Sequence, residues 1–147
     1  MEGLFDVTVR VYLAAGFFND QQLQKVEKTE GILRAKGLLV FSPREHQNES
    51  LPFGSREWRA ETFRDDRAAI LQSDVVVAIY DEQDAGTMWE IGFAYANQKP
   101  IVILHINEEP VNIMITESLH AYVDSFRQLD EYSFYRLRKI PYEGDVT

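Results

Sequence analysis

One stretch decides the predicted fold: Asp84-Ala-Gly-Thr-Met-Trp-Glu90-Ile-Gly-Phe-Ala-Tyr95-Ala96. It is flanked by two continuous apolar runs of strand length, Val75-Val-Val-Ala-Ile-Tyr80 before it and Ile101-Val-Ile-Leu104 after it. Continuous apolar runs are typical of strands that are buried on both faces in a parallel sheet. Gln98-Lys99-Pro100 precedes the second run and predicts the end of a helix. The unit is therefore predicted to be a strand, an acidic loop, a helix and a second strand.

Acidic side chains gather where the first of these strands ends. Asp81, Glu82 and Asp84 follow the strand directly, and Glu90 comes shortly afterwards in the predicted helix. Ligands of open α/β sheets bind beyond the carboxyl ends of the strands. We therefore expect a ligand site at this edge of the sheet, lined by carboxylates.

Glu90 has two interpretations at this stage. Thr87 and Glu90 match the S/T-x-x-E capping box, in which the glutamate only ties back to the start of its helix. A carboxylate in the first helical turn also lies near the positive end of the helix dipole and stays ionised. An ionised carboxylate that faces a cleft is what a carboxylate nucleophile requires. The two interpretations do not exclude each other, and the pattern leaves both open.

Strands and helices are predicted to alternate along the whole chain. The predicted strands cover residues 7–13, 38–41, 75–80, 101–104 and 121–126. The predicted helices cover residues 20–36, 56–72, 111–120 and 128–139, and a further helix follows the acidic loop, with Glu90 in its first turn. This alternation predicts a five-stranded parallel sheet with helices on both faces. The expected architecture is a single doubly wound α/β domain of Rossmann or flavodoxin type over residues 1–147.

Composition limits the classes of partner. The chain has 147 residues, a net charge of −9 and no cysteine. Nucleic-acid polymers select proteins with a basic surface, so we expect no such partner. The absence of cysteine excludes disulfides and cysteine-based metal sites. Residues 1–6 lack the pattern of a secretory signal, and no apolar run reaches the ~20 residues of a membrane span, so we expect a cytoplasmic protein without a membrane partner.

The loops after the first three predicted strands are expected to meet at one edge of the sheet. The side chains that this arrangement directs to one cleft are Tyr12, Phe17, Phe18, Gln47, Asp84 and Glu90. Asp66 joins them if its helix packs beside that edge. Phe17 and Phe18 are adjacent aromatics that either stack on a planar ligand or seal the end of the sheet.

Several kinds of chemistry lack their motifs in this sequence. There is no Walker A sequence and no G-x-G-x-x-G, and His46, His105 and His120 have no metal-binding spacing. We therefore expect no metal and no cofactor. A cluster of carboxylates near aromatics suits cleavage of a bond to an anomeric carbon, in which one carboxylate attacks and another donates a proton to the leaving group.

Three segments of the sequence together resemble the nucleoside 2-deoxyribosyltransferases. They are Val11-Tyr-Leu-Ala-Ala-Gly-Phe-Phe18, Asp84-Ala-Gly-Thr-Met-Trp-Glu90-Ile-Gly-Phe-Ala94 and Val111-Asn-Ile-Met114. The resemblance extends from the first strand to about residue 115, and the D-x-G-x-x-x-E-x-G-x-A pattern is its most specific part.

The resemblance assigns the catalytic roles. It makes Glu90 the nucleophile, and it gives Asp84 the tasks of binding the base and helping proton transfer. An aspartate on the preceding helix does likewise in this family and corresponds to Asp66, although Asp65 is adjacent. Tyr12 corresponds to a tyrosine that orients the nucleophile by hydrogen bonding.

The resemblance also implies substrate contacts and an assembly. Gln47 corresponds to a glutamine that contacts the base, and Asn112 to an asparagine that reaches the sugar 5′-hydroxyl from a neighbouring subunit. A homo-oligomer built from dimers, commonly a hexamer, is therefore expected. In one respect the chain departs from the family, which often ends in an aromatic residue whose carboxylate enters the site: this chain ends Asp145-Val-Thr147.

The sequence thus predicts an enzyme of nucleotide salvage that moves 2-deoxyribose between nucleobases, with a 2′-deoxyribonucleoside and a free base as its partners. The alternative is a hydrolase of 2′-deoxynucleosides or their 5′-monophosphates. The loop Ala14–Phe18 is apolar and has no serine or arginine for a phosphate, which favours nucleosides. A phosphoribohydrolase of the cytokinin-activating type would need paired glycines that are missing here, and a nucleotide sensor would not need three carboxylates.

Overall fold

The computed structural model describes residues 7–81 and 84–147. Glu82 and residues 1–6, on which the expectation about a secretory signal rests, lie outside these ranges. In chain order the elements are β1 (Arg10–Ala14), α2 (Asp20–Ala35), β2 (Leu39–Phe41), the 3-10 helix η1 (Pro43–Glu45), α3 (Arg56–Gln72), β3 (Val75–Ile79), α4 (Ala85–Ala96), β4 (Ile101–Leu104), α5 (Ile113–Thr116), β5 (Ala121–Val123) and α6 (Phe126–Glu131).

The strands form a five-stranded sheet in the order β2-β1-β3-β4-β5, and every neighbouring pair is parallel. The predicted doubly wound α/β fold is therefore confirmed. The order reverses between β1 and β3, whose register pairs Tyr12 with Val76. Crevices at such a switch point are where open α/β sheets bind ligands.

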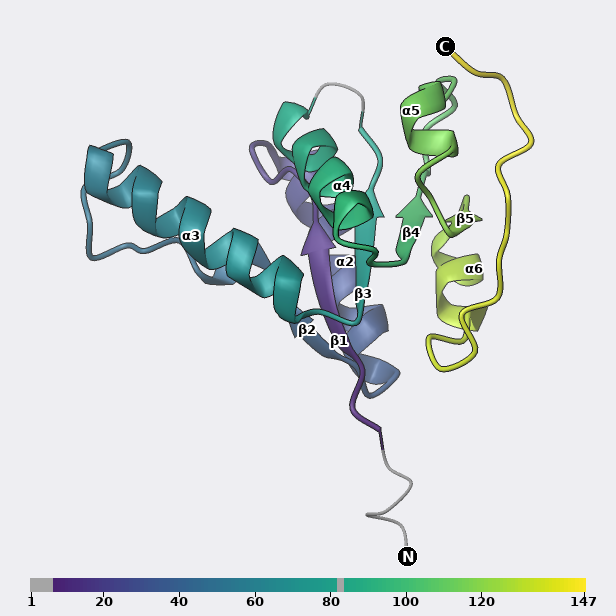
Figure 1. Ribbon diagram of the computed structural model, residues 1–147, viewed down its shortest axis with the longest axis horizontal. Coiled ribbons are helices and arrows are strands. Elements are labelled where there is room, and N and C mark those ends of the chain that lie inside the picture. The colour runs from purple at the N-terminus through teal and green to yellow at the C-terminus, as the bar shows by residue number, and fades with distance from the viewer. Residues whose placement is uncertain (1–6, 82–83) are drawn as a thin grey trace, which may run out of the picture.

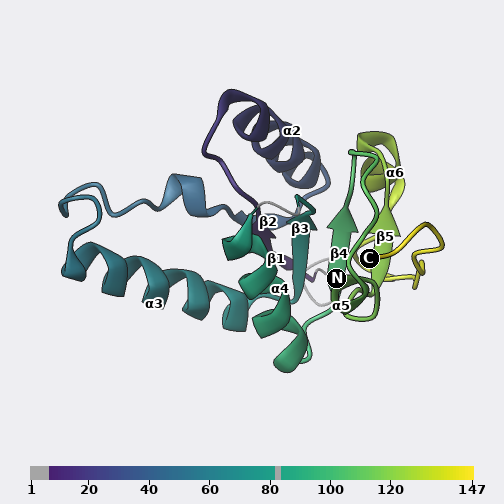
Figure 2. The same ribbon diagram turned by 90° about the horizontal axis from the view of Figure 1, so that it is seen from above.

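Helices cover both faces of the sheet (Figures 1 and 2). Helices α2 and α6 lie on one face, and α3, α4 and α5 lie on the other (Figure 2). Each face has its own buried cluster: Val26, Leu33 and Leu129 pack on the first face, and Ile70, Ile91 and Ile115 pack on the second. All five residues of β3 are buried, as expected for a strand covered on both sides.

Helix α3 extends away from the sheet over much of its length (Figure 1). It begins and ends at the residues that the sequence predicted, Arg56 and Gln72. The Ser55 hydroxyl accepts a hydrogen bond from the Trp58 amide and so caps the helix. Asn19 caps α2 in the same way, by accepting from the Gln22 amide.

The last part of the chain differs from the prediction. Helix α6 ends at Glu131 instead of residue 139, because Tyr132 takes an extended conformation and Leu137 has a positive φ of 48°. The Tyr132 hydroxyl donates to the carbonyl of Arg138 and fixes the non-helical turn. The predicted fifth strand is also shorter and ends at Val123, since Asp124 and Ser125 lead directly into α6.

The segment that follows β2 is held to α2 by a buried carboxylate. Glu30 is 3% exposed and accepts hydrogen bonds from the Ser42 hydroxyl (2.5 Å) and from Nε (2.8 Å) and Nη2 (2.5 Å) of Arg44. A buried carboxylate with several donors is satisfied electrostatically. The Glu30 network therefore fixes the start of the loop that carries His46 and Gln47.

Within residues 7–81 and 84–147, no helix combines the length and the apolar character that crossing a membrane requires.

Candidate active site

A cavity of about 420 Å³ lies beyond the carboxyl ends of β1, β2 and β3. Its volume falls in the range of small-molecule sites. The lining residues come from the loops after β1 and β2, from α3 and from the start of α4: Ala15, Phe17, Phe18, Pro43, His46, Gln47, Phe53, Trp58, Thr62, Phe63, Asp66, Arg67, Ile70, Asp84, Gly86, Thr87, Trp89 and Glu90. Three carboxylates thus face one mostly aromatic cavity.

Glu90 lies in the second turn of α4, because the helix begins at Ala85. The hydroxyl of Tyr12, which is fully buried in β1, donates a hydrogen bond to Oε2 of Glu90. The capping-box interpretation is therefore wrong: the N-cap is Asp84 instead of Thr87, and the Glu90 carboxylate faces Tyr12 and the cavity.

Asp84 is 7% exposed and is held by its own helix. The Thr87 hydroxyl donates a hydrogen bond to Oδ2 of Asp84. Gly16 explains how the loop after β1 comes this close, because a Cβ atom at Gly16 would lie only 2.8 Å from Oδ2 of Asp84. A side chain at residue 16 would therefore displace the carboxylate, and glycine is required there by space.

Asp66 lies on α3 and faces the same cavity, whereas Asp65 points elsewhere. Oδ2 of Asp65 accepts a hydrogen bond from Asn48 at 3.2 Å. Oδ1 of Asp66 is buried and has no hydrogen-bond partner within the described part of the chain. Of the two adjacent aspartates, Asp66 is therefore the one placed to meet a ligand.

Two carboxyls of the cavity, those of Glu90 and Asp66, have raised pKa values. Burial is the largest cause that raises the pKa of Glu90 to about 8; the charges of Asp66 and Asp84 act in the same direction, and the hydrogen bond from Tyr12 opposes them. Burial, followed by the charge of Asp65, raises the pKa of Asp66 to about 6.

The expectation that the helix dipole keeps Glu90 ionised is wrong, because loss of solvation raises the pKa of this carboxyl. Glu90 also lies beyond the first helical turn, where the dipole effect has faded. Burial and the Glu90 carboxylate raise the pKa of Tyr12 far above its ordinary value, so its hydroxyl stays protonated as a donor. The cavity therefore combines a fixed donor with carboxyls that hold protons near neutral pH.

The aromatic residues form two groups around the cavity. Phe17 and Phe18 stack with ring centroids 5.8 Å apart in the loop after β1. The second group, consisting of Phe53, Trp58, Phe63 and Trp89, contains one close pair, Phe53 with Trp58 at 4.6 Å, and a second, Phe63 with Trp89 at 5.3 Å. Flat apolar walls of this kind suit a planar ligand.

The segment after β2 adds polar groups to this wall. Gln47 lines the cavity and donates from Nε2 to the carbonyl of Arg44 at 2.6 Å. His46 also lines the cavity and stacks on Phe41 at 4.2 Å. Sequence reasoning gave His46 no part in the site; its position directly before Gln47, beyond the end of a strand, was the signal that could have found it.

Two further residues of the site, Trp58 and Phe63, are not among those that the sequence predicts to line the cleft. Phe63 is 54% exposed and both residues line the cavity, because the part of α3 that carries them extends beyond the sheet. Nothing in the spacing of apolar residues distinguishes a helix that packs on a sheet from one that projects past it.

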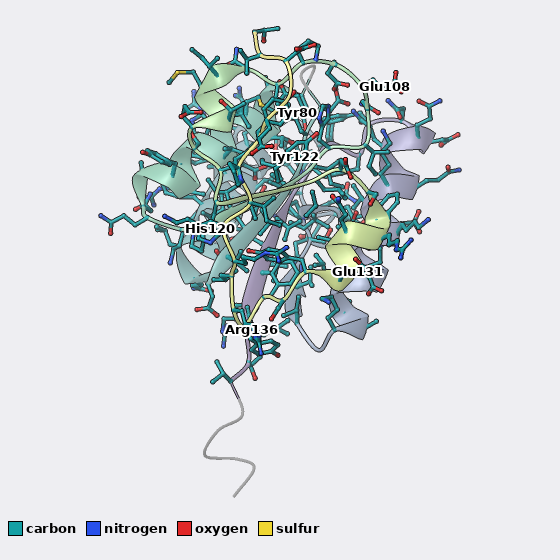
Figure 3. The ribbon with its side chains drawn as sticks, turned by 90° about the vertical axis from the view of Figure 1, so that its right-hand side faces the viewer. Tyr80, Glu108, His120, Tyr122, Glu131 and Arg136 are labelled. Atoms are coloured by element: carbon teal, nitrogen blue, oxygen red, sulfur yellow. The ribbon has the colours of Figure 1, made fainter. Side chains whose placement is uncertain are left out.

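Asn112 does not join this cavity. It lies at the N-cap of α5, and its backbone amide donates to the Tyr80 hydroxyl at 3.1 Å. Tyr80 packs on His105, which also contacts Tyr122; the two tyrosines are labelled in Figure 3. Asn112 lines a second groove, beside Thr147.

The C-terminal segment is paired with the residues around Asn112. The amide of Thr147 donates to the carbonyl of Val111 at 3.1 Å, and the amide of Ile113 donates to the carbonyl of Thr147 at 3.0 Å. The last residue therefore lies next to Asn112 and away from the carboxylates of its own chain.

No three His, Asp or Glu side chains in residues 7–81 and 84–147 are grouped as they would be around a metal ion.

Comparison with known proteins gives a consistent result. A family model described as nucleoside 2-deoxyribosyltransferase matches residues 11–130. A nucleoside deoxyribosyltransferase of Limosilactobacillus fermentum is 31% identical over 144 residues, which cover 85% of this chain and 86% of that protein.

Solved structures agree with the sequence match. A 2-deoxyribosyltransferase from Bacillus psychrosaccharolyticus superposes with a TM-score of 0.89 at 41% identity, covering 92% of this chain and all (100%) of that chain. A CMP N-glycosidase of Clostridium botulinum superposes with a TM-score of 0.60 at 24% identity, covering 83% of this chain and 94% of that chain, and shares the fold.

The raised pKa of Glu90 predicts a stability that depends on pH. The folded state holds this proton up to about pH 8, whereas the ordinary value for the unfolded chain is 4.5. The free energy of unfolding therefore falls as pH rises between these values, by up to about 1.4 kcal/mol per pH unit. We expect Glu90→Gln to flatten this fall between pH 6 and 8 in urea unfolding. Glu49→Gln, which alters an exposed side chain, is the control; identical slopes for both variants would contradict the assignment.

Proposed function

We propose that this chain, which belongs to the nucleoside 2-deoxyribosyltransferase family, transfers 2-deoxyribose from one nucleobase to another by way of an ester on Glu90. One observation carries the proposal: Glu90, Asp84 and Asp66 line the same cavity, and Tyr12 holds Glu90 by a hydrogen bond. A nucleophile and a proton donor on either side of one ligand are what a retaining displacement at an anomeric carbon needs.

The first half-reaction breaks the bond between C1′ and the base nitrogen. Glu90 attacks C1′ and forms the ester, while Asp84, together with Asp66, donates a proton to the departing base. The Tyr12 hydroxyl orients the attacking carboxylate. Thr87 and the space left at Gly16 fix the position of Asp84.

The second half-reaction reverses these steps with a different base. The incoming base attacks C1′, the ester bond to Glu90 breaks, and the proton of the base nitrogen returns to the aspartates. Two inversions at C1′ restore the starting configuration. The absence of a 2′-hydroxyl eases the oxocarbenium-like transition state, and a close wall beside C2′ excludes ribose.

The walls of the cavity supply the binding of the base. Phe17 and Phe18 provide a flat surface on which a purine or pyrimidine ring stacks. Gln47 also lines the cavity and contributes an amide for hydrogen bonding with the base. The cytoplasmic location and the role in nucleotide salvage stay predictions that accompany this activity.

We further propose that the enzyme works as a homo-oligomer built from dimers, up to a hexamer. Asn112 supports this proposal, because it lies outside the cavity of its own chain although the family resemblance gives it a contact with the sugar 5′-hydroxyl. A neighbouring copy would bring its own Asn112 to the mouth of the cavity.

Base exchange tests the proposed reaction directly. Purified protein is incubated with thymidine or 2′-deoxyinosine as donor and adenine as acceptor, and the products are separated by chromatography. We expect 2′-deoxyadenosine from the wild type and at least about a 10³-fold loss of rate for Glu90→Gln, since the nucleophile is gone. Glu49→Gln should retain the wild-type rate. Free base without 2′-deoxyadenosine would indicate a hydrolase, to be retested with 5′-monophosphates, and no turnover would refute the proposal.

The pH profile tests the part played by Asp66. With Asp66 and Glu90 sharing one proton, kcat/KM should be bell-shaped with limbs near the pKa values of about 6 and about 8. Asp66→Asn should abolish the fall of kcat/KM on the alkaline side of the profile, the alkaline limb. It should also lower kcat/KM by about 10²-fold or more. If the alkaline limb persists in this variant, Asp84 alone supplies the proton.

Mixed subunits test the role of Asn112. Asn112→Ala should lower kcat/KM by about tenfold, through loss of a hydrogen bond to the sugar. Glu90→Gln and Asn112→Ala chains that are refolded together should transfer the sugar faster than either variant does alone. The reason is that some sites then combine the intact Glu90 of one chain with the intact Asn112 of the other. The same treatment of each variant by itself is the control. Failure to regain activity would place Asn112 at the site of its own chain or outside any site.

A further inference from the structure

Gln22, in the first turn of α2, connects two loops of the active site by hydrogen bonds from one side chain. Its Oε1 accepts from the backbone amide of Phe18 at 2.8 Å. Its Nε2 donates to Oδ2 of Asp81 at 3.1 Å. The backbone N–H of Gln22 donates to Oδ1 of the cap residue Asn19 at 2.9 Å, which fixes the backbone from which this side chain extends.

The two loops that Gln22 joins carry different parts of the site. Phe18 belongs to the stacked aromatic wall after β1. Asp81 follows β3, and its carbonyl accepts a hydrogen bond from the amide of Asp84 at 3.0 Å. A single carboxamide therefore links the aromatic wall to Asp81, whose carbonyl holds the backbone amide of Asp84.

The loops are in contact at the same place. A Cβ atom at Gly16 would meet Oδ2 of Asp84 at 2.8 Å and Nε2 of Gln22 at 3.2 Å. The loop after β1 is thus pressed against both the carboxylate and the Gln22 amide. A small outward movement of this loop would open a path for water between Phe17, Phe18 and Asp84.

We propose that Gln22 is a positioning residue that holds the Phe17–Phe18 wall against Asp81 and Asp84 and so limits the access of water to the sugar ester on Glu90. The inference rests on the proposed function. When a base attacks C1′ of the ester, a new nucleoside forms. When water attacks instead, its oxygen bonds to C1′, the bond to Glu90 breaks, one proton passes to the aspartates, and free deoxyribose is released.

The hydrogen bond between residues 22 and 81 can be tested by exchanging which of the two side chains donates and which accepts. Gln22→Ala removes both hydrogen bonds. Gln22→Glu keeps the acceptor for the Phe18 amide but places a carboxylate opposite Asp81. The double variant Gln22→Glu/Asp81→Asn restores the link with its polarity reversed, because the asparagine amide now donates to the glutamate. Asp81→Asn alone retains an oxygen that accepts from Gln22. Gln21→Ala changes an exposed neighbour and is the matched control.

The first readout is the ratio of free deoxyribose to base-swapped nucleoside. We expect Gln22→Ala and Gln22→Glu to raise this ratio about fivefold, the factor that corresponds to one net hydrogen bond. The reversed pair, Asp81→Asn alone and Gln21→Ala should all stay near the wild-type ratio. Simple loss of folded protein would lower both products together and leave the ratio unchanged. An unchanged ratio in Gln22→Ala, with wild-type protein that transfers normally, would overturn the inference.

The second readout needs no turnover. Hydrogen exchange of the amides in residues 15–19 should be faster in Gln22→Ala and Gln22→Glu and should return to the wild-type rate in the reversed pair. If the wild type transfers no sugar, the proposed function fails, and the exchange data still decide whether Gln22 positions the loop. Equal exchange in all five variants and the wild type would refute the positioning role.

Discussion

The hydrogen bond from Tyr12 to Glu90 joins the inner strand β1 to helix α4 at the cavity that Glu90 lines. It depends on the packing of both partners: Tyr12 is completely buried and stacks on Phe41, while α4 is anchored on the sheet through Ile91 and Ala94. A carboxyl placed this way loses solvation, and that loss raises its pKa. The same burial would shield the sugar ester proposed at Glu90 from bulk water, so a single packing arrangement accounts for the raised pKa and supports the proposed intermediate.

Helix α2 contributes to the site although it lies on the opposite face of the sheet from α3 and α4. At its start, Gln22 holds the loop after β1, and in its third turn Glu30 holds the segment after β2 through Ser42 and Arg44. Both loops form walls of the cavity. The helix is itself packed on the sheet through Val26 and Leu33. The walls therefore take their position from a buried apolar contact, and this supports the rigidity that orientation of a substrate requires.

The sequence was informative where local patterns determine structure. Apolar runs located the buried strands, and the predicted helices over residues 20–36 and 56–72 agree closely with α2 and α3. It failed where a tertiary contact overrides the pattern. Thr87 and Glu90 match a capping box, yet Asp84 starts the helix earlier and Tyr12 takes the glutamate.

The candidate site, too, could be predicted only where the topology of the sheet determines which residues meet. The topology of a parallel sheet was sufficient to place Tyr12, Phe17, Phe18, Gln47, Asp84 and Glu90 near one edge, and the structure brings them together with Asp66. The second aromatic group could not be predicted, because the projection of α3 beyond the sheet depends on how the whole helix packs.

The residues that line the cavity all lie between Ala15 and Glu90, whereas Asn112 and the C-terminal segment belong to the other half of the sheet. Substitutions in the aromatic walls of the cavity therefore leave the backbone pairing of Val111 and Ile113 with Thr147 untouched.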